Sequence, residues 1–275
     1  MALVINHNMS SINAQRNLAN TGRSLKSSFE KVSSGLRINK AADDAAGLGV
    51  AENLDAASRS AKVAMRNTND GISVVQTAEG ATSEVGNIVK RMRELAVQSS
   101  SETLATAERS YVQDEFAQLS SEVDRISAVT EFNGLKLTNG SDTQVSVQVG
   151  VNNTTNDRIT ITMGDLRSTA LGVDTTTMSL NTSASAQSAI TALDTALDSI
   201  NSIRSDYGAV QNRLGDSLVN MEVYDENLQA AESQIRDVDF ASETAEMAKN
   251  QIMQQAGMSV LAQSGQAQQG ILSLI

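Results

Sequence analysis

The chain has 275 residues, 40% of them hydrophobic and 3% aromatic, with no tryptophan, cysteine or proline. The lack of cysteine excludes disulfide bonds, thiol catalysis and cysteine-bound metals, and the lack of proline permits long unkinked helices. The net charge of −11 argues against nucleic-acid or anionic-membrane partners, which require clustered Lys and Arg. No segment approaches the roughly 20 apolar residues of a membrane span, so we expect no membrane insertion.

The N-terminal segment is amphipathic but carries little apolar bulk among its Ser and Asn residues. Its apolar side chains recur at helical spacing: Leu18, Leu25, Phe29, Val32 and Leu36. His7, the only histidine, has no nucleophile or second metal ligand near it in the sequence. We interpret it as a polar assembly contact or a surface residue.

Asp43 and Asp44 stand directly before a run of small apolar residues. A pair of carboxylates could serve acid–base catalysis, but a helix start is the better interpretation, because Asp is a preferred N-cap. No Gly-rich phosphate loop and no convergent set of catalytic residues is found, so we expect neither an enzyme nor a cofactor.

Two further helices show the spacing of a coiled coil. Apolar residues alternate at four and three positions from Val74 to Leu95 within Gly71–Gln98, and again from Val112 to Ile126. The polar segment Ser99–Thr106 between them predicts the turn of an αα-hairpin.

The middle of the chain changes character. Apolar and polar residues alternate in two short runs, Gln144–Val149 and Arg158–Met163, separated by a Gly- and Asn-containing turn. This predicts a β-hairpin at about residues 140–165. The Thr- and Ser-rich segment Thr175–Ser185 has no periodicity, and we expect an exposed loop there.

A seven-residue apolar repeat then runs through Ser188–Arg236, at Leu193, Ile200, Tyr207, Leu214, Met221, Leu228 and Ile235. Such a long helix needs partners of similar length. The C-terminal segment is again weakly amphipathic, and its apolar residues include Met253, Ala256, Val260, Ile271 and Leu274.

These patterns predict a mainly α fold, an elongated helical bundle or coiled coil with a small β-hairpin region. We expect residues 1–40 and 239–275 to form one terminal coiled-coil domain and residues 41–238 a helical rod domain. The terminal helices are too weakly hydrophobic to hold a core alone, so we expect them to be disordered in the monomer and ordered by partners.

Short motifs in both halves of the chain resemble those of the bacterial flagellins. They occur in the family's order over about residues 1–138 and 187–275, which makes chance an implausible explanation. The motifs are Ile5-Asn-His-Asn, Ser33-Ser-Gly-Leu-Arg-Ile-Asn, Ala41-Ala-Asp-Asp-Ala-Ala-Gly-Leu, Asn67-Thr-Asn-Asp-Gly-Ile-Ser, Gln76-Thr-Ala-Glu-Gly-Ala, Arg93-Glu-Leu-Ala-Val-Gln, Glu131-Phe-Asn-Gly-Leu-Lys-Leu, Gly208-Ala-Val-Gln-Asn-Arg-Leu, Ala231-Glu-Ser-Gln-Ile-Arg-Asp-Val-Asp and Gln254-Gln-Ala-Gly.

The resemblance implies a short flagellin with the filament core and inner spoke alone. Its terminal helices would pair within the filament, and the ten apolar residues named at both ends would serve assembly. The implied protein is exported unfolded by a type III route, polymerises with copies of itself outside the cell, and serves swimming motility. Implied partners are an export chaperone and the hook–filament junction and filament cap proteins. Two alternatives stay open, a hook–filament junction protein and a non-flagellar signalling coiled coil.

The resemblance also implies a surface recognised by the vertebrate innate-immune flagellin receptor. Its residues here would be Arg91, Leu95 and Glu115. The alternative interpretation is that these residues belong to a contact between filament subunits, and the two interpretations are compatible.

Overall fold

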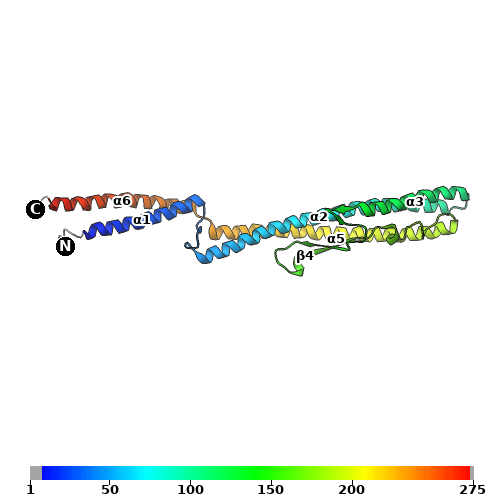
Figure 1. Cartoon of the computed structure of the whole chain (residues 1–275), viewed down its shortest axis with the longest axis horizontal. Coiled ribbons are helices and arrows are strands. Elements are labelled where there is room, and N and C mark those ends of the chain that lie inside the picture. Colours follow the sequence, from blue (N-terminus) through cyan, green and yellow to red (C-terminus); the bar gives the residue numbers. More distant parts are fainter. Residues whose placement is uncertain (1–7, 273–275) are drawn as a thin grey trace. The chain divides into compact units, whose positions relative to one another are not determined.

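The computed structural model of the chain describes residues 8–272, and the side chains of residues 8–266. Its elements, labelled in Figure 1, are α1 (Met9–Ser34), α2 (Ala45–Ser100), α3 (Thr106–Val129), β1 (Glu131–Phe132), β2 (Leu135–Lys136), β3 (Gln144–Gln148), the 3-10 helix η1 (Thr155–Asp157), β4 (Arg158–Thr162), α4 (Ser168–Leu171), α5 (Ser183–Arg236) and α6 (Phe240–Leu272). The prediction of a mainly helical chain with a small β-hairpin is confirmed.

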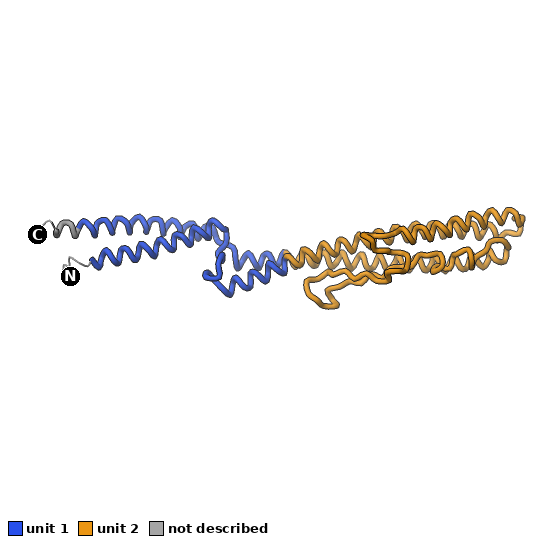
Figure 2. The backbone as a smooth tube through the Cα atoms, viewed as in Figure 1, with its two compact units in different colours: residues 1–58, 226–275 blue, residues 59–225 orange. Residues whose placement is uncertain are grey.

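The chain divides into two compact units, shown in Figure 2. Unit 1 contains residues 1–58 and 226–275, and unit 2 contains residues 59–225. Helices α2 and α5 contribute to both units, whereas α1 and α6 lie in unit 1 and α3 and the β-strands lie in unit 2.

Unit 2 is built on a core shared by α2, α3 and α5. Four successive positions of the seven-residue repeat in α5 are buried, with Leu193, Ile200, Tyr207 and Leu214 each at most 1% exposed. Val85, Val89 and Met92 of α2 and Phe116 of α3 complete the larger cluster around α5. Burial of each such side chain contributes about 1.5–3 kcal/mol to the stability of the fold, so these contacts between α2, α3 and α5 hold unit 2 together.

The β-hairpin packs on the same helices further along. Strands β3 and β4 pair antiparallel with Val147 opposite Ile159 and Val145 opposite Ile161, which confirms the predicted hairpin. Val147 lies over Gly71 of α2, where an added Cβ would come within 3.0 Å of it. The alternation of the strands therefore turns one face toward the helices and the other toward solvent.

A second, smaller hairpin was not predicted. Strands β1 and β2 are joined by Asn133 and Gly134, which both have positive φ values, 50° and 81°. Asn-Gly is the preferred sequence for this two-residue turn, because both positions must tolerate the left-handed region. The signal was present in the sequence, but the two-residue strands are too short for any alternation.

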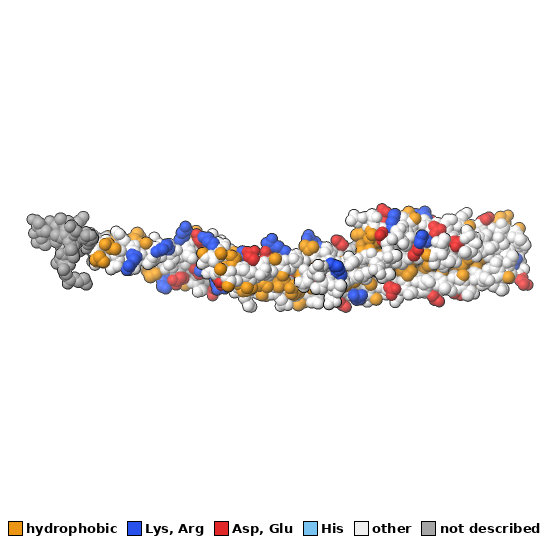
Figure 3. Space-filling view, turned by 60° about the horizontal axis from the view of Figure 1, so that its bottom comes forward, with side chains coloured by type: hydrophobic (Ala, Val, Ile, Leu, Met, Phe, Trp, Pro, Cys, Tyr) orange, Lys and Arg blue, Asp and Glu red, His pale blue; other side chains and the backbone are white. Residues whose placement is uncertain are grey.

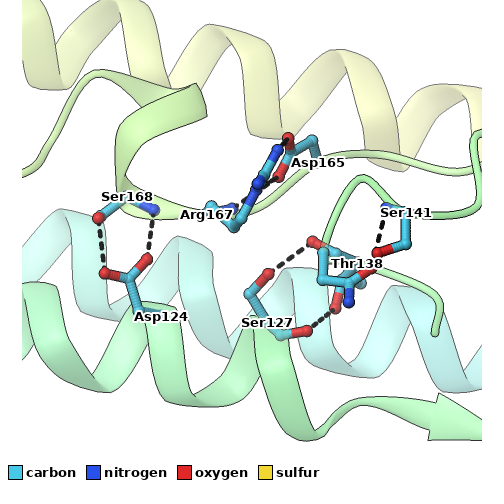
Figure 4. A network of polar contacts seen from close by, with 8 residues as sticks. Asp124, Ser127, Thr138, Ser141, Asp165, Arg167 and Ser168 are labelled. Atoms are coloured by element: carbon cyan, nitrogen blue, oxygen red, sulfur yellow. Dashed lines mark hydrogen bonds and ion pairs between the residues drawn. The ribbon is translucent and has the colours of Figure 1, made fainter.

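Polar contacts attach two connecting segments to α3, one between β2 and β3 and one between β4 and α5 (Figure 4). The Asp124 carboxylate accepts hydrogen bonds from the backbone N–H and the hydroxyl of Ser168, both at 2.8 Å. Ser127 and Thr138 each donate a hydroxyl to the other's carbonyl oxygen, at 2.6 and 3.1 Å. These bonds attach two connecting segments to α3.

The loop expected at Thr175–Ser185 is only partly as predicted. Met178 and Leu180 are buried, at 5% and 0% exposure, and α5 already begins at Ser183. The Ser99 hydroxyl donates to the Leu180 carbonyl oxygen at 2.5 Å and reinforces this attachment. The expectation of a fully exposed loop was therefore wrong, because two apolar residues among polar ones suffice to attach the segment to the core.

Candidate functional site

Helices α1 and α6 of unit 1 pack against each other in an antiparallel pair (Figure 1). Asn8 caps α1 by accepting the backbone N–H of Ser11, and its side-chain amide donates to the Ser264 carbonyl oxygen at 3.3 Å. Further along, Leu18 meets α6 at Gly257, where an added Cβ would lie 3.3 Å from the leucine methyl. The glycine thus lets the two helices approach closely.

The connections into this pair are joined by backbone hydrogen bonds. Arg37 N–H donates to the Arg236 carbonyl oxygen at 2.7 Å, and Val238 N–H donates to the Gly35 carbonyl oxygen at 3.0 Å. Gly35 ends α1 in the left-handed conformation, with φ at 74°. We call residues 35–38 and 236–238 the junction. It places the end of α1 beside the start of α6.

The contact between α1 and α6 has an unusual composition. In the described part of these two helices, the only buried side chains are polar ones, Ser28 at 4% and Asn250 at 2% exposure. The predicted α1 residues Leu18, Leu25 and Val32 are half-buried, and Leu36 is half-buried in the junction, where it bridges Asp237. The apolar side chains of the contact are therefore only partly buried.

Large apolar side chains lie instead on the outside of the pair. On α6, Ile252, Met253 and Val260 are 67%, 42% and 55% exposed, and Ala256 between them is exposed too. On α1, Phe29 is 65% exposed. Figure 3 shows hydrophobic side chains on the surface of the terminal helices, next to Lys and Arg side chains.

These outer residues define a stripe that lacks a partner within the described chain. Spacings of four residues place Ile252, Ala256 and Val260 on one side of α6. Contiguous exposed apolar surface on a protein marks an interaction site. Of the other residues predicted for assembly, Ile271 lies in α6 beyond the described side chains, and Leu274, like His7, lies outside the described residues.

A second surface brings together residues from α2 and α3 in unit 2. The Arg91 guanidinium pairs with Glu115 at 2.9 Å and with Glu94 at 2.9 Å. These hydrogen bonds raise the pKa of Arg91 above its usual value. Leu95, in contrast, is 1% exposed and belongs to the core. Two of the three residues of the expected receptor surface thus meet at the surface, and the third lies beneath it.

Of the two neighbouring aspartates, Asp44 caps α2 as predicted, whereas Asp43 stabilises the turn that precedes it. The Asp44 side chain accepts the Gly47 N–H at 2.9 Å at the start of α2. Asp43 accepts the backbone N–H groups of Lys40 and Asn39, which lowers the pKa of its carboxyl group.

Among the residues that the structure describes, no three metal-ligating side chains gather in one place. Over the same residues, no helix combines the length and the apolarity needed to span a membrane.

Ser28 and Asn250 were not singled out from the sequence. An apolar-periodicity search passes over polar residues, although Asn250 and Gly257 stand seven positions apart, as two contact positions in a coiled coil do.

The chain matches two family models, the bacterial flagellin N-terminal helical region over residues 5–143 and the C-terminal helical region over residues 190–275. It is 45% identical to a flagellin of Halalkalibacterium halodurans over 275 residues, which covers 99% of this chain and 100% of that protein. It is 41% identical to the flagellar filament 33 kDa core protein of Treponema phagedenis over 288 residues, covering 99% and 100%.

Solved structures agree. The crystal structure of Bacillus cereus flagellin superposes with a TM-score of 0.50 at 32% identity, over 57% of this chain and 88% of that one. A putative flagellar hook-associated protein from Vibrio parahaemolyticus reaches a TM-score of 0.59 at 14% identity, over 71% and 100%, which shows likeness of fold alone.

Proposed function

Since the chain belongs to the bacterial flagellin family, whose members are structural subunits of the flagellar filament, we propose that its residues 1–40 and 239–275 are the assembly domain. In this proposal α1 and α6 become fully ordered only when neighbouring copies cover the apolar stripe of α6. Residues 41–238 form the rod domain, which folds before assembly.

One observation carries the proposal: within the described side chains of the pair, Phe29, Ile252 and Val260 are more than half exposed, and Ser28 and Asn250 are the only fully buried residues. A helix pair whose apolar contacts are only half-buried gains little from closing, and each ordered residue costs roughly 1–2 kcal/mol of conformational entropy. Covering Ile252 and Val260 by another copy would supply the missing burial. Binding to the ordered form alone then drives the ordering by mass action.

We also propose that the stripe on α6 contacts a different surface of the next copy. A head-to-tail contact of this kind that does not close on itself produces an open helical polymer. The chain's place in the flagellar filament is outside the cell. We propose that it reaches the growing tip unfolded by type III export.

Seeded polymerisation tests this proposal. Full-length protein is compared with a fragment spanning Asn39 to Phe240, using sedimentation and electron microscopy. We expect filaments from the full chain only. In the full chain, Ile252→Ser should weaken polymerisation strongly while its exposed neighbour Gln251→Ser does not. Equal polymerisation of the fragment, or equal effects of the two substitutions, would refute the assignment.

We further propose that α6 binds the export chaperone before assembly, and that the hook–filament junction and filament cap proteins contact the terminal domain. The exposed apolar residues of α6 support a chaperone contact, because an unpolymerised subunit needs that stripe covered. Co-purification with the chaperone should be lost in a chain truncated after Val238. Retained binding would place the chaperone site elsewhere.

Recognition by the vertebrate flagellin receptor is proposed for the surface of Arg91 and Glu115. Support comes from their ion pair at 2.9 Å and from the 52% exposure of the Arg91 side chain. Leu95, being buried, would contribute by supporting the surface from below. Arg91→Ala should therefore abolish a reporter signal without lowering stability, whereas Leu95→Ala should lower both. If the wild-type monomer gave no reporter signal, receptor recognition would be rejected.

A further inference from the structure

The side of α1 that faces away from α6 combines apolar and basic side chains. Leu18 packs against α6, and a rotation of about 100° per residue places Met9, Ile12 and Arg16 on the opposite side of α1. Met9 and Ile12 are 63% and 48% exposed, and Arg16 is exposed too. Among the described residues, no carboxylate pairs with Arg16, whose guanidinium donates to the side-chain oxygen of Asn13 at 3.2 Å. This side of α1 can therefore accept a partner of opposite charge.

A complementary side is found on the part of α5 that lies in unit 2. Val219 and Val223 are 59% and 52% exposed, and Asp216 beside them is exposed as well. All three lie about half a helical turn away from the buried Leu214, so they point away from the core of unit 2. Within the described chain, Asp216 takes part in no ion pair. Helix α5 thus presents apolar and acidic groups where α1 presents apolar and basic ones.

The spacing on the two helices agrees when they run in opposite directions. Arg16 follows Met9 by seven residues, and Asp216 precedes Val223 by seven residues. In an antiparallel contact, Met9 placed over Val223 therefore brings Arg16 over Asp216, and the second apolar residue of each helix lies between them. A guanidinium and a carboxylate that meet in this way form charge-assisted hydrogen bonds.

The distribution of charge favours a second copy of the chain as the occupant of this side of α5. The chain carries a net charge of −11, so copies repel one another unless opposite charges meet locally. Helix α1 is an exception in this acidic chain, because it contains four basic residues and a single acidic one, Glu30. Its basic side is complementary to an acidic surface of another copy, and Asp216 with the two exposed valines provides such a surface.

We propose that the outer side of α1 docks antiparallel on α5 of a neighbouring copy, with Arg16 paired to Asp216. The inference rests on the proposed function and identifies a pair of surfaces that copies present to each other in the filament. These surfaces are separate from the apolar stripe of α6. Each copy supplies α1 to one neighbour and α5 to another, so the contact is head-to-tail.

Disulfide cross-linking tests the contact directly, because the chain has no cysteine of its own. Met9→Cys and Val223→Cys are introduced into separate full-length chains, which are mixed, polymerised on seeds and oxidised. We expect a dimer with one chain of each variant in the sedimented filaments, and none in the unpolymerised mixture. Ser24→Cys, at an exposed position elsewhere on α1, replaces Met9→Cys in the matched control and should give no such dimer. Filaments with no mixed dimer, or with equal amounts in both mixtures, would overturn the inference.

A charge swap tests the ion pair. Arg16→Glu and Asp216→Arg should each raise the critical concentration for polymerisation about tenfold, because two like charges replace an attractive pair. The chain with both substitutions should return toward the wild-type value, which would also show that each substituted chain folds. Lys26→Glu combined with Asp216→Arg is the matched control and should not recover, because Lys26 lies beyond the paired section.

The outcomes separate this inference from the proposed function. If Arg16→Glu with Asp216→Arg polymerises no better than either single variant, the pairing is refuted while the filament function stands. Wild-type protein that forms no filaments would reject the proposed function, and the contact between copies with it.

Discussion

The helix contacts of unit 2 and the terminal helix pair of unit 1 place their large apolar side chains in opposite directions. In unit 2 the large apolar residues face inward, from Val85 and Phe116 to Leu193. In the terminal pair, apart from half-buried leucines and valines, the buried positions are polar, and Ile252 and Val260 face outward. Both regions are helical, so helix content does not show whether a helix pair is stable without another copy. The direction of the apolar side chains decides whether a helix pair completes its own fold or requires another copy.

The largest expected contrast comes from truncating one apolar side chain in each region. Phe116→Ala should cost about 3–5 kcal/mol of unfolding free energy, because it leaves a cavity in a core where Phe116 is 0% exposed. At roughly 2–4 °C per kcal/mol, the melting temperature should fall by roughly 6–20 °C. Leu18→Ala should leave the melting temperature of the monomer unchanged and impair polymerisation. Thermal melting followed by circular dichroism checks both, and an equal fall for the two variants would contradict the comparison.

A smaller effect is expected from one hydroxyl in unit 2. Burial raises the pKa of Tyr207, and its hydroxyl oxygen accepts the Gly164 N–H at 3.0 Å. Tyr207→Phe preserves the packing but leaves that N–H without its acceptor, at a cost of about 1–2 kcal/mol. Chemical denaturation should detect the loss. Tyr224→Phe, on the same helix but 37% exposed, is the control and should change nothing.

Near the junction, two glycines of α2 provide a matched pair. A Cβ added at Gly47 would lie 2.5 Å from an Asp44 carboxylate oxygen and 2.8 Å from Ile38, whereas Gly49 has open space. Gly47→Ala should disturb the cap and cost about 1 kcal/mol, and Gly49→Ala should stabilise α2 by about 0.5–1 kcal/mol. Hydrogen exchange of the amides in residues 35–50 measures both. Faster exchange in Gly49→Ala than in wild type would show that the open space around Gly49 does not decide the effect of the substitution.

The smallest effect is a pH dependence confined to unit 2. The pKa of Asp165 is lowered, first by its side-chain hydrogen bond with Arg167. A carboxyl group with a lowered folded pKa contributes stability above its unfolded value, near 3.8, and loses it as the pH falls through the folded value. Asp165→Asn should therefore be slightly less stable than wild type at pH 7, by less than about 1 kcal/mol, and this difference should shrink as the pH falls below about 3.8. A difference in stability that does not change with pH would indicate a packing effect.

Periodicity predicted the elements of unit 2 well, because there the apolar repeat and the buried face coincide. The same repeat could not show which neighbour covers a stripe. On α6 the residues Ile252, Ala256 and Val260 form a stripe that faces outward, while Asn250 and Gly257, which an apolar pattern omits, lie on the side of the contact with α1. Leu95 lies on the four-three repeat of α2, and periodicity alone places it in the core, where it is found. Met178 and Leu180 were missed because no repeat contains them.

The junction has a consequence for how the two ends find each other. Its backbone bonds hold residues 35–38 against residues 236–238, so α1 ends beside the start of α6 although Ser34 and Phe240 are far apart in the sequence. Their pairing is an intramolecular event with an effective concentration of the order of millimolar, as for modules on a short flexible linker. The contact between α1 and α6 is weak, but it can still form rapidly when another copy binds. The junction already holds the ends of the two helices together.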